Sequence, residues 1–206
     1  MRIYPLSPFY GGRVWAEGYF FSKGINVMTP LESLGPRICI IGPSNAGKST
    51  LADLIAQKIG ATPVHLDQLA HYPESHWQRR PDQEFIDLHG KEIIQESWVI
   101  EGNYSICMPE RFNRASAVIW LDPPLIGCTW RYIWRSFFAK PGRIGGLAGA
   151  RHEFSWELVK FTWTKYPKNK LKYKQLLKNF DKPLLVIPSM QLLNRYTSFW
   201  GLKESV

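Results

Sequence analysis

The sequence predicts an α/β fold with a five-stranded parallel sheet and helices on both faces. Five short apolar runs, rich in β-branched residues, alternate with segments of helical periodicity, as expected for strands that are buried on both sides. A chain of 206 residues with 45% hydrophobic residues is long enough for one such domain with a full core. A glycine-containing run between the first strand and the first helix is the third observation, because parallel α/β sheets bind ligands at such turns.

The first half of the domain alternates three strands with two helices. The predicted strands are 37–42, 63–67 and 98–101. A helix over 49–59 follows the first strand and ends at Gly60, a typical C-cap. Asp82 is placed to cap a second helix that runs to about Glu96. The apolar faces of the two helices are predicted to be Leu51, Leu54, Ile55 and Ile59 in the first, and Phe85, Ile86, Ile93 and Ile94 in the second.

The second half of the domain is basic and rich in aromatic residues. Its predicted elements are, in chain order, a strand at 117–121, a helix at about 124–139, a glycine-rich stretch at 141–149, a long basic helical region to Phe180, a strand at 183–187 and a helix at 191–200. The sequence shows no internal repeat.

We place the start of the folded domain at residue 37 and expect it to span 37–206. Residues 1–36 are rich in aromatic residues, glycine and proline and have no helical period. Arg13, Glu17 and Lys23 interrupt the apolar run that a signal peptide requires. Three interpretations of this extension stay open: a docking segment, a β-hairpin, or an over-extended reading frame whose true start is Met28.

The net charge of +9 is unevenly distributed. Residues 37–103 contain six basic and nine acidic residues, whereas residues 104–206 contain seventeen basic and six acidic ones. A basic half favours a polyanionic partner. The charge alone does not decide whether this partner is a nucleotide phosphate, a nucleic acid or a membrane surface. No run approaches the roughly 20 apolar residues that cross a bilayer. We therefore expect no membrane partner, nucleic acid as a weaker candidate, and a monomer or dimer.

Three cysteines are present, and they do not form a recognisable metal or disulfide pattern. Cys39, Cys107 and Cys128 cannot all pair, and none lies in a CxxC or Cys/His cluster. Reduced thiols are typical of a cytoplasmic protein, which is the location that we expect.

A phosphate-binding motif lies between the first strand and the first helix. Residues 42–49 read Gly-Pro-Ser-Asn-Ala-Gly-Lys-Ser and match GxxxxGK[ST] at every fixed position. The glycines let the backbone wrap a phosphate, so that N–H groups and the helix N-terminus point at it. Lys48 is expected to contact the β- and γ-phosphates, and the Ser49 hydroxyl to ligate Mg²⁺. The predicted nucleotide site consists of Gly42, Ser44, Asn45, Ala46, Gly47, Lys48, Ser49 and Thr50.

The nucleotide is predicted to be ATP, because no Asn/Thr-Lys-x-Asp-like base-reading motif of GTPases occurs in the chain. The alternative interpretation of residues 42–49 is a chance turn before a core helix.

Carboxylates follow three of the predicted strands. Asp67, Glu101 and Asp122 each end a strand, and ligands of open α/β sheets bind at this edge. A carboxylate beside the phosphate loop can hold Mg²⁺ through water or take the proton of an acceptor hydroxyl. Strand-end turns and helix caps are the alternatives, and the Asp-Pro-Pro sequence favours a turn for Asp122.

Paired arginines precede the glycine-rich stretch. Arg131 and Arg135 are four residues apart and therefore share a helix face. Arg143 lies among the glycines and Arg151 follows them, which predicts a lid at about 139–152 that closes over the transferring phosphates. A solvated basic helix followed by a flexible loop is the alternative.

Together these residues resemble the adenylate-kinase-like group of P-loop small kinases, and within it the bacterial topology modulation proteins, or adenylate-kinase-related proteins. The resemblance covers about residues 37–190 and rests on Gly42–Thr50, His65-Leu-Asp67, Trp77, Arg80-Pro81, Trp98–Ser105, Arg111, Val118–Pro124 and the Arg131-xxx-Arg135 pair. It implies five parallel strands, ATP with Mg²⁺, and transfer of the γ-phosphoryl group to a nucleotide or another small acceptor.

The resemblance also implies roles for individual residues. Arg131 and Arg135 match the lid arginines that bind ATP phosphates in adenylate kinases. Glu101 stands where those enzymes have the aspartate of an Asp-Gly-aromatic-Pro-Arg motif, but the arginine of that motif is absent here. The acceptor therefore stays open, and Arg80 or Arg111 is a candidate to replace the missing arginine.

A kinase is thus the first interpretation of the chain. Its expected catalytic residues are Lys48, Asp67, Arg131 and Arg135; its Mg²⁺ residues are Ser49 and Glu101; and its acceptor-side residues are Asp67, Trp77, Arg80, Glu101, Asn103, Tyr104, Arg111 and Arg143.

A nucleotide-dependent regulatory or nucleic-acid-binding protein with little kinase activity is the second interpretation. The tract 160–182 contains eight lysines together with Phe161, Trp163, Tyr166 and Tyr173, as in a track for nucleic acid. A solvated amphipathic helix with an aromatic core face explains the same tract. A bare NTPase is a third, less favoured class.

Overall fold

A computed structural model describes residues 20–22, 25–75, 77–138 and 154–202. The predicted lid at about 139–152, with Arg143 and Arg151, lies outside these residues.

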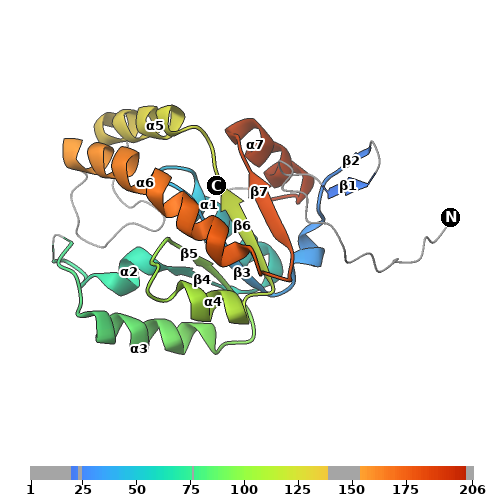
Figure 1. The fold of residues 1–206 in the computed structure, drawn as a ribbon, viewed down its shortest axis with the longest axis horizontal. Helices are drawn as coiled ribbons and strands as arrows, with labels where there is room; N and C mark the ends of the chain where they lie inside the picture. The colour runs from blue at the N-terminus through green and yellow to red at the C-terminus, as the bar shows by residue number, and fades with distance from the viewer. Residues whose placement is uncertain (1–19, 23–24, 76, 139–153, 203–206) are drawn as a thin grey trace.

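The centre of the molecule is a five-stranded parallel sheet, which confirms the predicted fold class (Figure 1). Its strands are β3 (Arg37–Ile41), β4 (Thr62–His65), β5 (Trp98–Glu101), β6 (Ala117–Leu121) and β7 (Leu184–Ile187), in the spatial order β4-β5-β3-β6-β7. β3, the first strand of this sheet along the chain, is therefore its central strand. The chain adds β4 and β5 on one side of β3 and then β6 and β7 on the other, so the strand order reverses direction next to β3. Crevices form at the carboxyl ends of strands at such a point.

Helices cover both faces of the sheet because alternate residues of each strand face opposite sides. Ile38 and Ile40 of β3 pack with α1 (Lys48–Ile59) and α7 (Met190–Phe199). Cys39 and Ile41 belong to the core on the other face. That core also contains residues of α2 (Leu66–Ala70), α3 (Asp82–Ile93), α4 (Met108–Arg114) and α6 (Trp156–Leu177). α5 (Leu125–Phe138) lies beside α6 at the margin of the molecule (Figure 1).

Three local predictions are wrong at element ends. β4 ends at His65, so Asp67 lies in the first turn of α2 rather than at a strand end. α3 ends at Ile93, and Ile94 is exposed because the chain leaves the helix there. The N-cap position of α3 is Pro81, not Asp82, which forms part of the first turn.

The short helix α4 was not predicted, because a seven-residue segment that contains proline has little helical period of its own. Pro109 is tolerated there because it lies in the first turn, where its missing N–H has no intrahelical acceptor.

Part of the N-terminal extension packs on the domain. β1 (Phe20–Ser22) pairs with β2 (Ile25–Val27) as an antiparallel hairpin, which matches one of the three interpretations. Leu31 and Leu34, in a 3₁₀ turn, are buried in the core beneath α1 and α7. The indole N–H of Trp200 donates to the carbonyl of Thr29 at 2.8 Å. Residues 29–34 thus contribute to the core ahead of residue 37.

Among the described residues, no helix is both long enough and apolar enough to cross a membrane.

Candidate phosphate-transfer site

The phosphate-binding motif forms the turn between β3 and α1, as predicted. Gly42 has φ +148°, and a Cβ there would collide with the carbonyl oxygen of Leu121. Gly47 has φ +91° and immediately precedes α1, whose first turn has no side-chain cap. The N–H groups of this turn lack intrahelical acceptors, and the positive end of the helix dipole lies beside them. The loop therefore has the backbone of an anion site.

Asn103 fixes the start of this loop. Its side-chain Oδ1 accepts from the N–H of Gly42 at 3.1 Å, and its Nδ2 donates to the carbonyl of the same residue. Gly42 thus engages both ends of the amide of Asn103, a residue predicted on the acceptor side.

Lys48 and Ser49 begin α1 at the other end of the loop. Lys48 Nζ donates to the carbonyl of Pro43 at 3.0 Å, across the loop. Ser49 Oγ donates to Oε1 of Glu101 at 2.9 Å. β5 neighbours β3 in the sheet, which brings Glu101 at its end to the first turn of α1.

Glu101 belongs to a chain of side-chain contacts that extends behind the loop. His65 Nδ1 lies 3.2 Å from Oε1 of Glu101, and His65 Nε2 lies 2.9 Å from Oδ1 of Asp53. Asp53 is four residues after Ser49, so both project from one face of α1. The four side chains join α1, β4 and β5 in a continuous polar network.

The surroundings of Glu101 favour its charged form. Burial opposes ionisation, but the hydrogen bond with His65, the charge of Lys48 and the bond from Ser49 together hold its pKa below the ordinary value. Burial likewise acts to lower the pKa of His65, but Glu101 and Asp53 raise it above the ordinary value.

Ser49 and Glu101 have the chemistry of a magnesium site completed by a nucleotide. Mg²⁺ in phosphate-transfer sites is held by one or two carboxylates, water and phosphate oxygens rather than by an all-protein cage. The described part of the chain contains no cluster of three or more His, Cys, Asp or Glu side chains suited to a metal. A hydroxyl and an ionised carboxylate beside the anion loop fit the ion.

Two arginines of α5 reach the opposite side of the loop. Arg131 Nε donates to the backbone carbonyl of Asn45 at 2.9 Å. Arg135 Nη1 donates to the side-chain Oδ1 of the same residue at 3.1 Å. The shared helix face predicted from their spacing therefore points at the phosphate loop.

Asp67 and Tyr104, two residues that the sequence predicts on the acceptor side, contact each other. Asp67 is exposed in the first turn of α2 and accepts the Tyr104 hydroxyl at 2.7 Å. The Tyr104 ring packs on Phe85 of α3, with 4.9 Å between ring centroids. Burial and the nearby Asp67 charge raise the pKa of Tyr104, so it acts as a donor to the carboxylate. This contact orients Asp67 near the carboxyl edge of the sheet.

Trp77 and Arg80 lie in the loop between α2 and α3. The half-exposed indole of Trp77 packs edge-on against His71, with 5.3 Å between ring centroids. Arg80 donates to Glu84 and stacks over the ring of Tyr72, 4.2 Å from its centroid. The guanidinium predicted to replace the missing acceptor-binding arginine is thus paired with the first turn of α3 and stacked on a ring of its own loop.

Arg111 is another residue that the sequence predicts on the acceptor side. Its side chain is fully buried and donates to the carbonyl of Gly102 at 3.0 Å. The helix α4 directs the Arg111 side chain toward the core of the sheet. Arg111 therefore supports the Gly102 turn from beneath and does not face solvent.

Asp122 does more than form a turn. It accepts the Tyr166 hydroxyl at 2.9 Å and pairs with Lys170, so it joins β6 to α6. Tyr166 and Tyr173 are buried, as an aromatic core face predicts, whereas Phe161 and Trp163 of the same tract are exposed.

His65 and Asp53 are the site residues that sequence reasoning missed. Asp53 had a usable signal in its four-residue spacing from Ser49. His65 stands two residues before Asp67, but only the pairing of β4 with β5 shows that it faces Glu101.

Neither a protein-family model nor a curated protein matches the sequence. Among solved structures, the chain is similar to shikimate kinase from Acinetobacter baumannii, with 12% identity, 85% of this chain and 100% of that chain covered, and a TM-score of 0.49. A gluconokinase from Sinorhizobium meliloti 1021 has 16% identity, with 79% of this chain and 87% of that chain covered and a TM-score of 0.48. A shikimate kinase from Bacteroides thetaiotaomicron has 16% identity, with 81% and 99% covered and a TM-score of 0.46. These likenesses concern the fold alone.

Proposed function

We propose that this protein is an adenylate-kinase-like phosphotransferase that moves the γ-phosphoryl group of Mg-ATP to a small-molecule or nucleotide acceptor. The observation that supports this proposal most directly is the arrangement around the phosphate loop. On one side Ser49 forms a hydrogen bond with Glu101, and on the other Arg131 and Arg135 contact Asn45. Phosphoryl transfer needs positioning and charge stabilisation rather than covalent catalysis, and these groups supply both.

The loop binds the triphosphate through backbone N–H groups and Lys48. Lys48 donates its hydrogen bond to an uncharged acceptor, the Pro43 carbonyl. A charged phosphate oxygen is a stronger partner for the ammonium group. Mg²⁺, held by Ser49 and Glu101, would neutralise charge on the β- and γ-phosphates. Arg131 and Arg135 provide delocalised positive charge for the transferring group, as arginines do in phosphoryl-transfer enzymes.

Asp67 orients or deprotonates the acceptor hydroxyl. It is an exposed carboxylate whose position a second side chain, Tyr104, fixes. An acceptor bound against Trp77 would present its hydroxyl on this side, with the nucleotide on the other.

ADP formation from ATP and Mg²⁺ tests the proposal when it is measured with a panel of acceptors. The panel contains nucleoside monophosphates, nucleosides, shikimate-like compounds and sugar alcohols. We expect one class to stimulate ADP formation, and Lys48→Ala to lower the stimulated rate by about 100-fold. Lys58→Ala is the matched control, because Lys58 is an exposed lysine in the last turn of the same helix.

Unchanged ADP formation in Lys48→Ala would contradict a role for the loop. Slow hydrolysis that no acceptor stimulates would favour the regulatory interpretation. Of the four aromatic residues on which that interpretation depends, Tyr166 and Tyr173 are buried and cannot stack on bases, whereas Phe161 and Trp163 are exposed.

A further inference from the structure

The outward face of α5 is a continuous apolar stripe. Its members expose more than half of their surface and recur at helical spacing: Ile126, Trp130, Trp134, Phe137 and Phe138. The charged residues of α5, Arg131 and Arg135, contact the phosphate loop on a different face. The stripe is therefore outside the transfer site.

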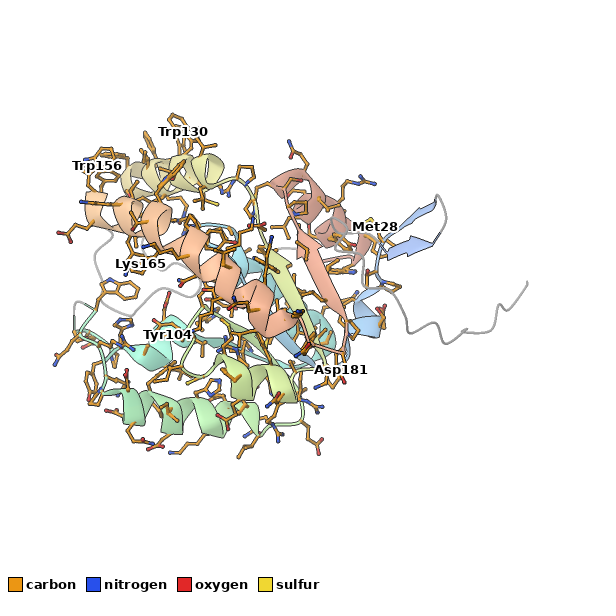
Figure 2. All side chains as sticks on the ribbon, viewed as in Figure 1. Met28, Tyr104, Trp130, Trp156, Lys165 and Asp181 are labelled. Atoms are coloured by element: carbon orange, nitrogen blue, oxygen red, sulfur yellow. The ribbon has the colours of Figure 1, made fainter. Side chains whose placement is uncertain are left out.

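The apolar surface continues onto the start of α6. Phe137 stacks on Phe154 at 6.1 Å between centroids, and Phe154 contacts Trp156 edge-on at 5.0 Å. Trp156 is 70% exposed. Figure 2 shows Trp130 and Trp156 at the same outer margin of the molecule. We call the α5 stripe together with Phe154 and Trp156 the aromatic surface.

The aromatic surface is larger than the scattered apolar residues of an ordinary protein exterior. Soluble monomers rarely expose contiguous apolar patches beyond a few hundred Å², and larger ones mark interaction sites. Trp134 and Phe138 contact each other at 4.3 Å between centroids while both stay exposed to solvent, so these two rings form one apolar area.

The helix α6, which contributes Trp156 to the aromatic surface, is rich in basic residues. The described helices α5 and α6 contain eight basic residues and one acidic residue, Glu157. Lys170 is paired with Asp122, but exposed lysines follow along α6: Lys160, Lys165, Lys168, Lys172 and Lys174. An occupant of this region is expected to be apolar where it meets α5 and anionic where it meets α6.

We propose that the aromatic surface binds peripherally to the surface of an anionic lipid bilayer. An interfacial helix lays Trp, Phe and Ile into the boundary between headgroups and acyl chains, while lysines contact anionic headgroups. The sequence predicted no membrane partner because no run can cross a bilayer. Peripheral binding needs no crossing helix, and the outward direction of the stripe becomes visible only in the structure.

Two other occupants fit the charges and chemistry less well. A second copy would bring two lysine-rich α6 helices toward each other without compensating acids. Nucleic acid would need cations among the stacking rings, but the α5 stripe has none, and the exposed rings of the lysine tract, Phe161 and Trp163, lie on α6 outside this stripe.

Vesicle sedimentation of the full chain tests the proposal. One set of vesicles is phosphatidylcholine alone, and the other contains about 30% phosphatidylglycerol. We expect binding to the anionic vesicles only, and weaker binding when NaCl rises from about 0.1 M to about 0.5 M. The double variant Trp130→Ser/Trp134→Ser should lower vesicle affinity by about tenfold or more, since each indole contributes much buried area. Phe199→Ser, at an exposed aromatic of α7, is the control and should bind like the wild type.

A second measurement needs no variant, so misfolding of the double variant would not block the test. Bromine-labelled lipids in the anionic vesicles should quench the tryptophan fluorescence of the wild-type protein. No binding to either vesicle, absence of quenching, or full binding by a folded double variant overturns the proposal. The proposal is also overturned if the wild type does not bind vesicles but forms an oligonucleotide complex or a dimer that the double variant loses. That result would assign the aromatic surface to the nucleic acid or to a second copy of the chain.

Discussion

Glu101 is buried, yet its contacts favour the ionised form of its carboxylate beside the phosphate loop. The Ser49 hydroxyl and His65 Nδ1 meet the same carboxylate oxygen, Oε1. His65 is itself placed by Asp53, which projects from α1. The position of the carboxylate that we propose for magnesium is thus set by a residue that would not touch the ion, and we regard His65 as a positioning residue.

Replacing His65 by glutamine tests this role. We expect the apparent affinity for Mg²⁺ in the presence of ATP to fall about tenfold or more, as for other residues that orient a metal ligand. Binding of ATP without Mg²⁺ should stay within about twofold, because the loop N–H groups and Lys48 are untouched. Titration of a fluorescent ATP analogue with and without Mg²⁺ measures both quantities. His71→Gln is the control, and an equal loss under the two conditions would indicate a structural defect instead.

At the scale of elements, α3 buries a histidine on the face for which its sequence pattern predicts only apolar side chains. The periodicity predicts Ile94 as inward, but the helix ends at Ile93 and the chain turns Ile94 to solvent. His89 is fully buried on the inward face instead, and its ring nitrogens have no hydrogen-bond partner among the described residues. Burial, with the nearby Arg111 charge, lowers its pKa to about 4.

His89 therefore makes the stability of α3 and the domain dependent on pH. Because its folded-state pKa of about 4 lies below the ordinary 6.5, the unfolded chain binds more protons between these values. Stability should fall as the pH drops through this window, by about 2 kcal/mol from His89 between about pH 7 and pH 5. Urea unfolding at the two pH values measures the change.

The variant His89→Leu should remove this part of the pH dependence, whatever its effect at pH 7. His71→Gln serves again as the control, since His71 lies in the loop after α2. If wild type and His89→Leu lost the same stability between the two pH values, His89 would not be the group responsible.

At the scale of the whole molecule, the strand order explains why the site is where it is. β3 is central, and β5 and β6 flank it, so Glu101 and Asp122 end strands on either side of the phosphate loop. Glu101 reaches Ser49, whereas Asp122 is taken by Tyr166 and Lys170 of α6. Two acids at equivalent strand ends therefore have different uses, one at the site and one in joining the sheet to a helix.

The sequence predicted the five strands, the phosphate loop and the α5 arginines, because each depends on short-range signals. Apolar runs mark buried strands, GxxxxGK[ST] fixes a turn, and a four-residue spacing fixes a helix face. The partners of His65, Asn103 and Arg111 depend on which strands and helices become neighbours. Spacing along the chain does not contain that information, so two of these residues were assigned to the acceptor and the third received no role.

The most direct test of the central claim is equilibrium binding of ATP with Mg²⁺, because it requires no knowledge of the acceptor. Isothermal titration of the wild type, Lys48→Ala and Lys58→Ala compares two lysines of α1 that differ in their distance from the loop. We predict saturable one-site binding by the wild type and Lys58→Ala, and an affinity lower by at least about tenfold in Lys48→Ala. Absence of binding by the folded wild type, or equal binding by Lys48→Ala, would contradict a nucleotide site at residues 42–50.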